Sequence, residues 1–575
     1  MKRRMQKITA LGLAILTGLF ATGCGVGTQA PSQTGGEPMQ EAADDGAAAE
    51  ETTDAGTREA AVGTTGGQTV TMAFTGSWNT LCPLAATADY DDCAANPMFD
   101  RLLELDGKGG YSYRLCESFE ISDDFKVLTL HLRDDVKWHD GEPFTADDVI
   151  FTYQLYSDAD LVTSRRLFLQ GVDGCDESGI ELSDKSVHVE KVDDHTVDVY
   201  YTEPKSEIAM FAWNMYFTIL PKHCLEGKDP ATILQDDFWT KPVGTGPYIF
   251  ESTVPGESVT YKANPDYYLG APSIETLCIK VIQPASLTTA MMAGEIDLIN
   301  GTLAAIPDAD MEFAQTLDGY DAQSMEGTSS HFFVLNNKVF NSAKIRKAFA
   351  MLLDKDAMIE SGCYGNGTKV YTTYAPKNVW NDQATIDEYG YEFDPETAIE
   401  MLQEEGFDFD RTYTVCINDL AVRQAICTVM QDTWAQYGLK LEIVTLDTQT
   451  CISAMREGSY DMWINGGAGA NFTSLETGFI IWVTIDDSGE YGPYNLAQVD
   501  DPTFMNVEKE LASATTEEDI QRLTKQIQEL ELTEYNYVYI IGPYINTAIS
   551  DRLLGVDKDM MLTRGFNYSE WTIAE

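Results

Sequence analysis

The chain has 575 residues, which is too long for one ordinary domain and predicts three or four domains, or two with insertions. Hydrophobic residues make up 44% of it, enough to build sizeable cores. Lys and Arg number 38 against 92 Asp and Glu, a formal net charge of −54. This excess of acid argues against a nucleic-acid partner and against docking on anionic lipid through basic patches.

The N-terminus is typical of an export signal, residues 1–23. Four basic residues among the first seven precede an apolar stretch over 8–20, which is too short to span a membrane. The sequence Ala-Thr-Gly-Cys that ends at Cys24 resembles a bacterial lipobox, so we expect lipid attachment at Cys24. Residues 24–68 are rich in small and acidic residues and lack aromatic ones, which predicts a flexible tether. We therefore expect an extracytoplasmic body that is anchored to the cell membrane, at the cell surface or in the periplasm, only through its lipid.

Ten cysteines follow Cys24, and none of them stands in a C-x-x-C pair. This spacing argues against zinc ribbons, thioredoxin-like motifs and common iron–sulfur sites. Two interpretations stay open: disulfides, as an exported chain permits, or buried free thiols. Cys82 and Cys93 form the nearest local pair for a disulfide. The six His are scattered, so we expect no metal centre and no cofactor.

Strands and helices alternate along the rest of the chain, which predicts an α/β or α+β fold in several lobes. Strands are expected at 69–74, 125–132, 187–201 and 439–446. Helices are expected to start after Thr145, and over 345–359, 398–402, 425–437 and 517–532.

A series of segments in a fixed order carries a family resemblance. The segments are LHLRDDVKWHDGEPFTADDV at 130–149, GTGPY at 244–248, NPDYYLGAP at 264–272, GEID at 294–297, LNN at 335–337, IRKAF at 345–349 and GSYDM at 458–462. From about residue 70 to the C-terminus, the chain resembles the oligopeptide/dipeptide-binding family (family 5) of bacterial extracellular solute-binding proteins. Proteins of this family deliver ligand to ATP-binding-cassette (ABC) importers.

The resemblance implies a two-lobed, periplasmic-binding-protein-like α/β fold with mixed sheets and an additional domain inserted in lobe one. Transferred to this chain, lobe one is 69–106 with 239–325 and 546–575, the inserted domain is 107–238, and lobe two is 326–545. It also implies a monomer that captures ligand between its lobes and docks on permease subunits.

Several motif residues are interpreted as scaffold. His139-Asp140-Gly141 predicts a tight turn in which Gly141 permits an otherwise strained conformation and Asp140 bonds local backbone. The segment 244–247 lacks the Gly-Lys-Ser/Thr ending of a phosphate loop and is interpreted as a crossover between lobes. Arg346 is expected to pair with an acid of its own lobe.

The ligand is expected between the lobes. In the family, one wall is the loop after the first strand, and another is the segment after the Y-D-M motif. The cleft candidates are Trp78, Asn79, Trp463, Asn465, Gly466, Gly467, Asn471 and Trp482. Trp and Asn suit a pocket with an apolar face and a few placed hydrogen bonds, and core packing of each Trp is the alternative.

One departure concerns the ligand class. Peptide binders of the family often carry G-W…D in the second wall, where the Asp pairs with the peptide's amino group, and 466–471 has neither Trp nor acid. Peptide stays the first choice, and an oligosaccharide is next because Trp78, Trp463 and Trp482 could stack on sugar faces. Metal chelates and haem rank lower.

The same fold could serve a surface sensor or a peptide chaperone without transport. The chain has no G-x-S-x-G, no H-E-x-x-H and no S-x-x-K with its partner motifs, so we expect no catalytic residues and no enzyme. An exported hydrolase would have to turn over a peptide or a glycoside.

Overall fold

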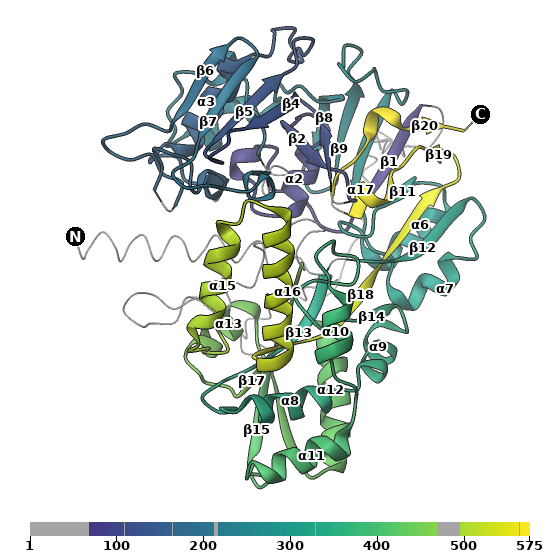
Figure 1. Ribbon diagram of the computed structural model, residues 1–575. Helices are drawn as coiled ribbons and strands as arrows, with labels where there is room; N and C mark the ends of the chain where they lie inside the picture. Colours follow the sequence, from purple (N-terminus) through teal and green to yellow (C-terminus); the bar gives the residue numbers. More distant parts are fainter. Residues whose placement is uncertain are drawn as a thin grey trace, which may run out of the picture.

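The computed structural model describes residues 68–108, 110–163, 165–176, 178–211, 217–327, 329–468, 495–562 and 564–574. Cys24, Asn471 and Trp482 lie outside these residues, as do the signal and nearly all of the tether. Within the described ranges, no helix has the length and apolar character needed to cross a membrane. The elements form two bodies, and strand β18 runs from one to the other (Figure 1).

The first body contains lobe one and the inserted domain. Its strands are β1 Thr69–Phe74, β2 Leu103–Leu105, β3 Tyr111–Tyr113, β4 Cys116–Ile121, β5 Val127–Leu132, β6 Val189–Asp193, β7 Thr196–Tyr200, β8 Tyr248–Val254, β9 Ser258–Ala263, β10 Thr276–Val281, β11 Leu298–Ile299, β12 Tyr320–Glu326, β19 Leu553–Leu554 and β20 Thr572–Ile573. Its helices are α2 Asp89–Ala95, α3 Ala146–Ser157, α4 Glu207–Phe211, α5 Lys222–Leu225, α6 Leu287–Met292, α7 Met311–Ala314 and α17 Lys558–Leu562.

The second body corresponds to lobe two. Its strands are β13 Ser329–Leu335, β14 Gly367–Lys369, β15 Thr412–Ile417, β16 Lys440–Thr445 and β17 Met462–Ala468. Its helices are α8 Ala343–Met351, α9 Lys355–Cys363, α10 Gln383–Tyr389, α11 Pro395–Glu404, α12 Ala421–Gln436, α13 Thr448–Arg456, α15 Pro502–Ala512 and α16 Glu517–Glu534. Strand β18, Tyr537–Ser550, belongs to both bodies.

One mixed sheet extends through both bodies. Its strand order is β16-β15-β17-β13-β18-β11-β1-β10-β9-β8, and β12 and β14 pair with β18. In lobe one, β1 runs parallel to β10 and β11, while β8, β9 and β10 are antiparallel neighbours. In lobe two, β13 lies antiparallel between β17 and β18, and β15 runs parallel to β16 and β17. The mixed α/β fold class is therefore confirmed.

A layer of helices covers each face of the lobe-two sheet, and alternate side chains of its strands pack against one layer or the other. Phe333 and Leu335 of β13 face one core with helices α8 and α12. Phe332 and Val334 face a second core with α13, α15 and α16. Successive side chains of a strand point to opposite faces, so both faces of this sheet are apolar and buried.

The inserted segment forms its own four-stranded antiparallel sheet, β4-β5-β7-β6. The stretch 187–201, predicted as one alternating strand, is the hairpin of β6 and β7, with a turn at Asp194 and His195. Its hydrophobic side chains share one continuous core with those of lobe one. The insertion therefore packs on lobe one as part of a single hydrophobic unit.

The segment predicted as one helix over 345–359 is two helices, α8 and α9, and the single-helix prediction is wrong. The Asp354 carboxylate accepts the backbone N–H of Ala357 at 3.0 Å, which caps α9 at its start. Asp competes with helix backbone for hydrogen bonds and is a preferred N-cap residue, so it begins a new helix here. Apolar residues keep their helical spacing on both sides of this break, so the sequence pattern does not reveal it.

The tight turn predicted at His139-Asp140-Gly141 is confirmed. The interpretation of 244–247 as a crossover between lobes is wrong, because this segment leads from the inserted segment into β8 within the first body. Gly141 has φ +95°, and its N–H donates to Trp138 O at 2.8 Å. His139 Nε2 lies 3.0 Å from Gly246 O, and the Gly244 N–H donates to His139 Nδ1 at 3.2 Å. Burial lowers the pKa of His139 to about 4, so this imidazole is a neutral bridge between the turn and the 244–247 segment.

Other motif residues join distant segments within each lobe. Arg346 pairs with Glu534 at 3.3 Å, as expected. Asp297 of the GEID motif accepts the backbone N–H of Thr71 at 2.8 Å and pairs with Arg552 Nε at 2.6 Å. The Asp297 side chain is only 1% exposed, so its charge depends on Arg552 for compensation.

We expect Arg552→Met to lower the free energy of unfolding of the first body by about 3–5 kcal/mol, because it leaves a buried carboxylate without its cation. Urea denaturation followed by tryptophan fluorescence would measure the change. Lys280→Gln, which breaks the half-exposed pair with Glu295, is the matched control and should cost at most about 1 kcal/mol. Equal effects of the two substitutions would contradict this ranking.

None of the ten described cysteines forms a disulfide, so the suggested Cys82–Cys93 bridge is not formed. Both of these cysteines are buried, and burial raises the pKa of Cys82 to about 12. Cys416 Sγ and Cys451 Sγ lie 2.9 Å apart in the core of lobe two. A disulfide bond is about 2.0 Å long, so a small movement of these two sulfur atoms would allow a bridge to form.

We expect refolding in oxidised glutathione to join Cys416 to Cys451 before the core closes over them, with one glutathione disulfide reduced to two thiols that take up the two protons. Peptide mapping by mass spectrometry under denaturing conditions would detect the cross-linked fragment. Cys416→Ser should abolish it, whereas Cys427→Ser, a nearby buried cysteine, should leave it intact. A bridge that forms between other cysteines instead would contradict the prediction.

Candidate ligand-binding site

The loop after β1, expected as the first wall, is held by one buried carboxylate. Asp91 Oδ1 accepts the backbone N–H of Asn79 at 2.6 Å, and its Oδ2 accepts those of Thr87 and Ala88 at 3.1 and 3.2 Å. Trp78 is half-buried, and its ring meets that of Phe74 edge-on at 6.3 Å. The loop therefore presents part of an indole ring and an exposed Asn79 on a fixed backbone.

The second wall begins on β17, whose side chains alternate between the two faces of the sheet. Trp463 is 1% exposed and lies in the core beside Cys416, Cys451 and Phe332. Its Nε1 has no hydrogen-bond partner in the described part of the chain. Asn465 has the same strand parity as Trp463 and is also buried. The structure thus places the Trp463 ring in the core of lobe two.

Gly466 has the opposite parity and lies opposite His331 of β13. A Cβ at this position would stand 2.5 Å from His331 Nδ1 and 3.1 Å from Ser330 O, so only Gly fits the close approach. Gly466 O accepts a hydrogen bond from Arg423 Nη2 at 3.3 Å. His331, Gly466 and Arg423 form a buried polar group on the α12 side of the sheet, which we call the β17-end cluster.

Burial gives the β17-end cluster an unusual charge pattern. It lowers the pKa of His331 to about 3, with a further contribution from the neighbouring Arg423 charge, so the imidazole is neutral. It lowers the pKa of Arg423 to about 10, so the guanidinium still carries its charge at pH 7. Arg423 is 3% exposed, and within the described ranges its guanidinium donates to Gly466 O and forms no ion pair with a carboxylate. His331 Nδ1 and Arg423 Nε also lack hydrogen-bond partners there.

The β17-end cluster lies next to the segment in which the chain crosses from one body to the other. Strand β13 begins at Ser329, three residues after β12 ends, and its first residues pair with Gly466, Gly467 and Ala468. His331 pairs with Ile541 on β18, and β12 pairs with the next part of β18. The end of β17 therefore lies where the chain crosses from lobe one to lobe two.

The structure brings together only part of the predicted site. Asn465, Gly466 and Gly467 are neighbours on β17, and Trp78 and Asn79 are neighbours on the lobe-one loop. No hydrogen bond or ring contact links these two groups in the part of the chain that the structure describes. Asn471 and Trp482 follow β17 beyond the described residues. The assignment of these residues to ligand contact stays a prediction.

His331 and Arg423 were missed by the sequence analysis. His331 stands in the apolar strand β13, and Arg423 stands alone in the first turn of α12, with neither residue in a recognisable motif. Their meeting depends on the pairing of β13 with β17 and on the packing of α12 against that sheet. A charged residue in a helix stripe otherwise filled by Ile426, Cys427 and Met430 was the one available signal.

The two lobes, joined through β18, have the fold of two-lobed periplasmic binding proteins. The family model for bacterial extracellular solute-binding proteins, family 5 (middle region), matches residues 110–489. The chain therefore belongs to this family, and the resemblance drawn from its motifs is confirmed.

Relatives in this family carry different ligand names. Heme-binding protein A of Haemophilus influenzae is 26% identical over 493 residues, which cover 81% of this chain and 85% of that protein. Di/tripeptide-binding protein 1 of Pseudomonas aeruginosa is 27% identical over 403 residues, covering 66% and 72%. The solved structure of the oligopeptide-binding protein AppA of Bacillus subtilis with a nonapeptide is similar in fold, with a TM-score of 0.67 and 21% identity over 88% of this chain and 99% of that one.

We expect Gly466→Ala to lower the free energy of unfolding of lobe two by about 1–3 kcal/mol, because the added methyl overlaps the His331 ring. Urea denaturation would measure it. Gly367→Ala is the matched control in another strand, since its Cβ would meet nothing closer than 3.4 Å. His331→Ala should recover part of the loss in the double variant, and additive losses would show that the two residues do not collide.

Proposed function

We propose that this chain is the lipid-anchored ligand-capturing component of an ABC importer, that it takes a peptide between its lobes, and that it delivers the peptide to the permease. Membership of family 5 over residues 110–489 carries the proposal. Relatives named for dipeptides, tripeptides and oligopeptides support peptide as the ligand class. The extracytoplasmic position fits the expected signal and the acylated Cys24.

The mechanism in this proposal is closure of the two lobes over ligand. A closed form that gains contacts from both walls is stabilised by ligand, which shifts the population toward it. The walls are the loop with Trp78 and Asn79 on lobe one and the segment that follows β17 on lobe two. Asn465, Gly466, Gly467, Asn471 and Trp482 remain the lobe-two candidates, whereas the Trp463 ring is buried in the core.

The β17-end cluster suggests which end of a peptide binds there. Arg423 supplies a buried positive charge with no described ion-pair partner, and a carboxylate compensates a guanidinium better than any neutral group. The predicted wall offers no acid over 466–471 that would bind an ammonium. We infer that a peptide carboxylate, rather than its amino group, lies toward the end of β17.

Native mass spectrometry of the purified body lacking residues 1–24 tests the ligand class. A bound mass that leaves on denaturation and fragments as a peptide ladder is the expected result. A hexose-spaced ligand would replace peptide by oligosaccharide, and a haem mass would match the relative named for heme. Turnover of an added peptide would point instead to a hydrolase.

The carboxylate assignment is tested by thermal shift with matched peptides that end in a free acid or an amide. The free acid should stabilise the wild-type protein more, and Arg423→Gln should remove this difference. Arg522→Gln, an exposed Arg on α16, is the matched control and should keep it. Trp78→Ala should reduce stabilisation by both peptides. A free-acid preference that survives in Arg423→Gln would refute the carboxylate assignment, while peptide binding itself would stand.

A further inference from the structure

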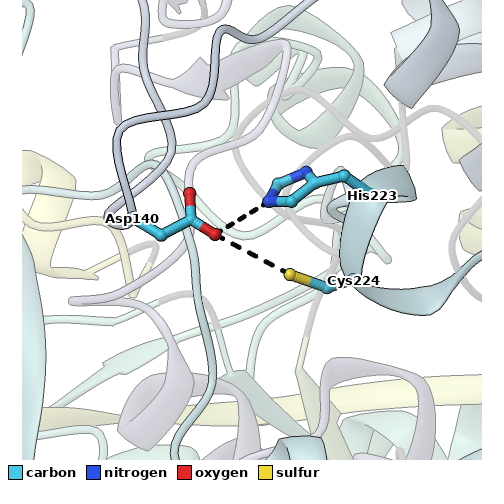
Figure 2. Close-up of side chains that lie close together, drawn as sticks. All are labelled: Asp140, His223 and Cys224. Atoms are coloured by element: carbon cyan, nitrogen blue, oxygen red, sulfur yellow. Dashed lines mark hydrogen bonds and ion pairs between the residues drawn. The ribbon is translucent and has the colours of Figure 1, made fainter.

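Three side chains with different metal-binding atoms meet within residues 107–238, apart from the β17-end cluster. Asp140 lies in the turn after β5, and His223 and Cys224 are consecutive residues of α5 (Figure 2). Asp140 Oδ2 lies 2.9 Å from His223 Nε2 and 3.9 Å from Cys224 Sγ. The three donor atoms all lie within 4.8 Å of one another.

The backbone holds these donors in place without help from a bound ion. The Glu142 N–H donates to Asp140 Oδ1 at 3.3 Å, which leaves Oδ2 facing α5. On the other side, the Lys222 N–H donates to Asp148 Oδ1 at 2.9 Å and fixes the start of α5. The Trp138 ring meets the His223 ring edge-on at 6.0 Å. The turn and the short helix are therefore anchored independently, with their donors converging.

The distances suit a small tetrahedral ion. With metal–ligand bonds of about 2.0–2.3 Å, two ligand atoms of a tetrahedral zinc site lie about 3.3–3.7 Å apart. The oxygen–nitrogen and oxygen–sulfur distances of 2.9 and 3.9 Å fall on either side of this range. Side-chain movements of less than about 1 Å would bring all three donors to bonding distance.

The donor set also selects the kind of ion. A thiolate and an imidazole favour borderline and soft cations such as Zn²⁺, whereas Ca²⁺ and Mg²⁺ prefer oxygen ligands. Lys228 is the cation that faces Cys224, and its ammonium is bound by both oxygens of Asp236 at 2.8 Å. Its charge is therefore compensated, and the surrounding acidic protein favours a cation.

We propose that Asp140 Oδ2, His223 Nε2 and Cys224 Sγ form a Zn²⁺ site with a fourth position open to water. The thiol releases its proton to solvent on binding, because the thiolate is the ligand. The exposed edges of Asp140 and His223 give an ion access to the site. A bound ion would join the 139–142 turn to α5, two segments that the Asp140 carboxylate already links through His223 and Cys224.

Cobalt(II) is the probe, because cobalt in a tetrahedral site with a thiolate absorbs in the near ultraviolet and the visible. Titration of the untagged, reduced full-length chain should produce a sulfur-to-cobalt band at one equivalent, and added Zn²⁺ should remove it. Cys224→Ser should abolish the band. His223→Gln should weaken cobalt binding at least about tenfold, since even groups that only support a metal ligand carry that much affinity.

Cys278→Ser is the matched control, because Cys278 is also half-exposed but lies on β10 away from the site, and this variant should keep the band. Equal melting temperatures of the metal-free variants would show that each of them folds. The proposal is overturned if wild-type protein gives no band with its thiols reduced, or if the band persists in Cys224→Ser. Either result would leave Asp140 and His223 as an ordinary hydrogen-bonded pair at the surface.

Discussion

The hydrogen-bond ladder of β18 is the constraint on which the relation between the two bodies depends. One continuous strand of 14 residues pairs with β13 through residues 537–541 and with β12 through 544–550. Gly542 and Pro543 separate these two pairings, and Pro has no N–H to give to a ladder. If the lobes close, the backbone must therefore change conformation at this point of β18 and in the neighbouring connection from β12 to β13, beside the β17-end cluster.

Helices cover both faces of the lobe-two sheet, which limits the strand residues that a ligand can contact. Both faces are covered by helices, so the side chains of β17 are used for packing until the strand reaches the junction. Trp463 belongs to this packing, whereas Gly466 brings its backbone against His331 and Arg423. A buried guanidinium is costly to leave uncompensated, which is why its presence beside the interlobe passage bears on the ligand.

The motifs that identify the family act mainly through buried polar contacts between segments far apart in the chain. His139 bridges the inserted turn to the 244–247 segment, and Asp297 joins β1 to Arg552 near the C-terminus. Such groups tolerate little change, because each loses its partner when the other is replaced. They mark the fold and leave the ligand open, in keeping with relatives named for peptides and for heme.

The sequence by itself determined what depends on neighbouring residues and on a long ordered series of motifs. It predicted the strand over 69–74, the helix that starts after Thr145, the turn at Gly141 and the family. It missed the break at Asp354, because apolar spacing continued through the cap. Only the tertiary structure decided which distant side chains meet. His331, Gly466 and Arg423 converge through strand register, and Asp140 meets His223 across 83 residues through the anchoring of a turn and a short helix. No local pattern encodes these contacts, because each is set by the pairing and packing of segments far apart in the chain.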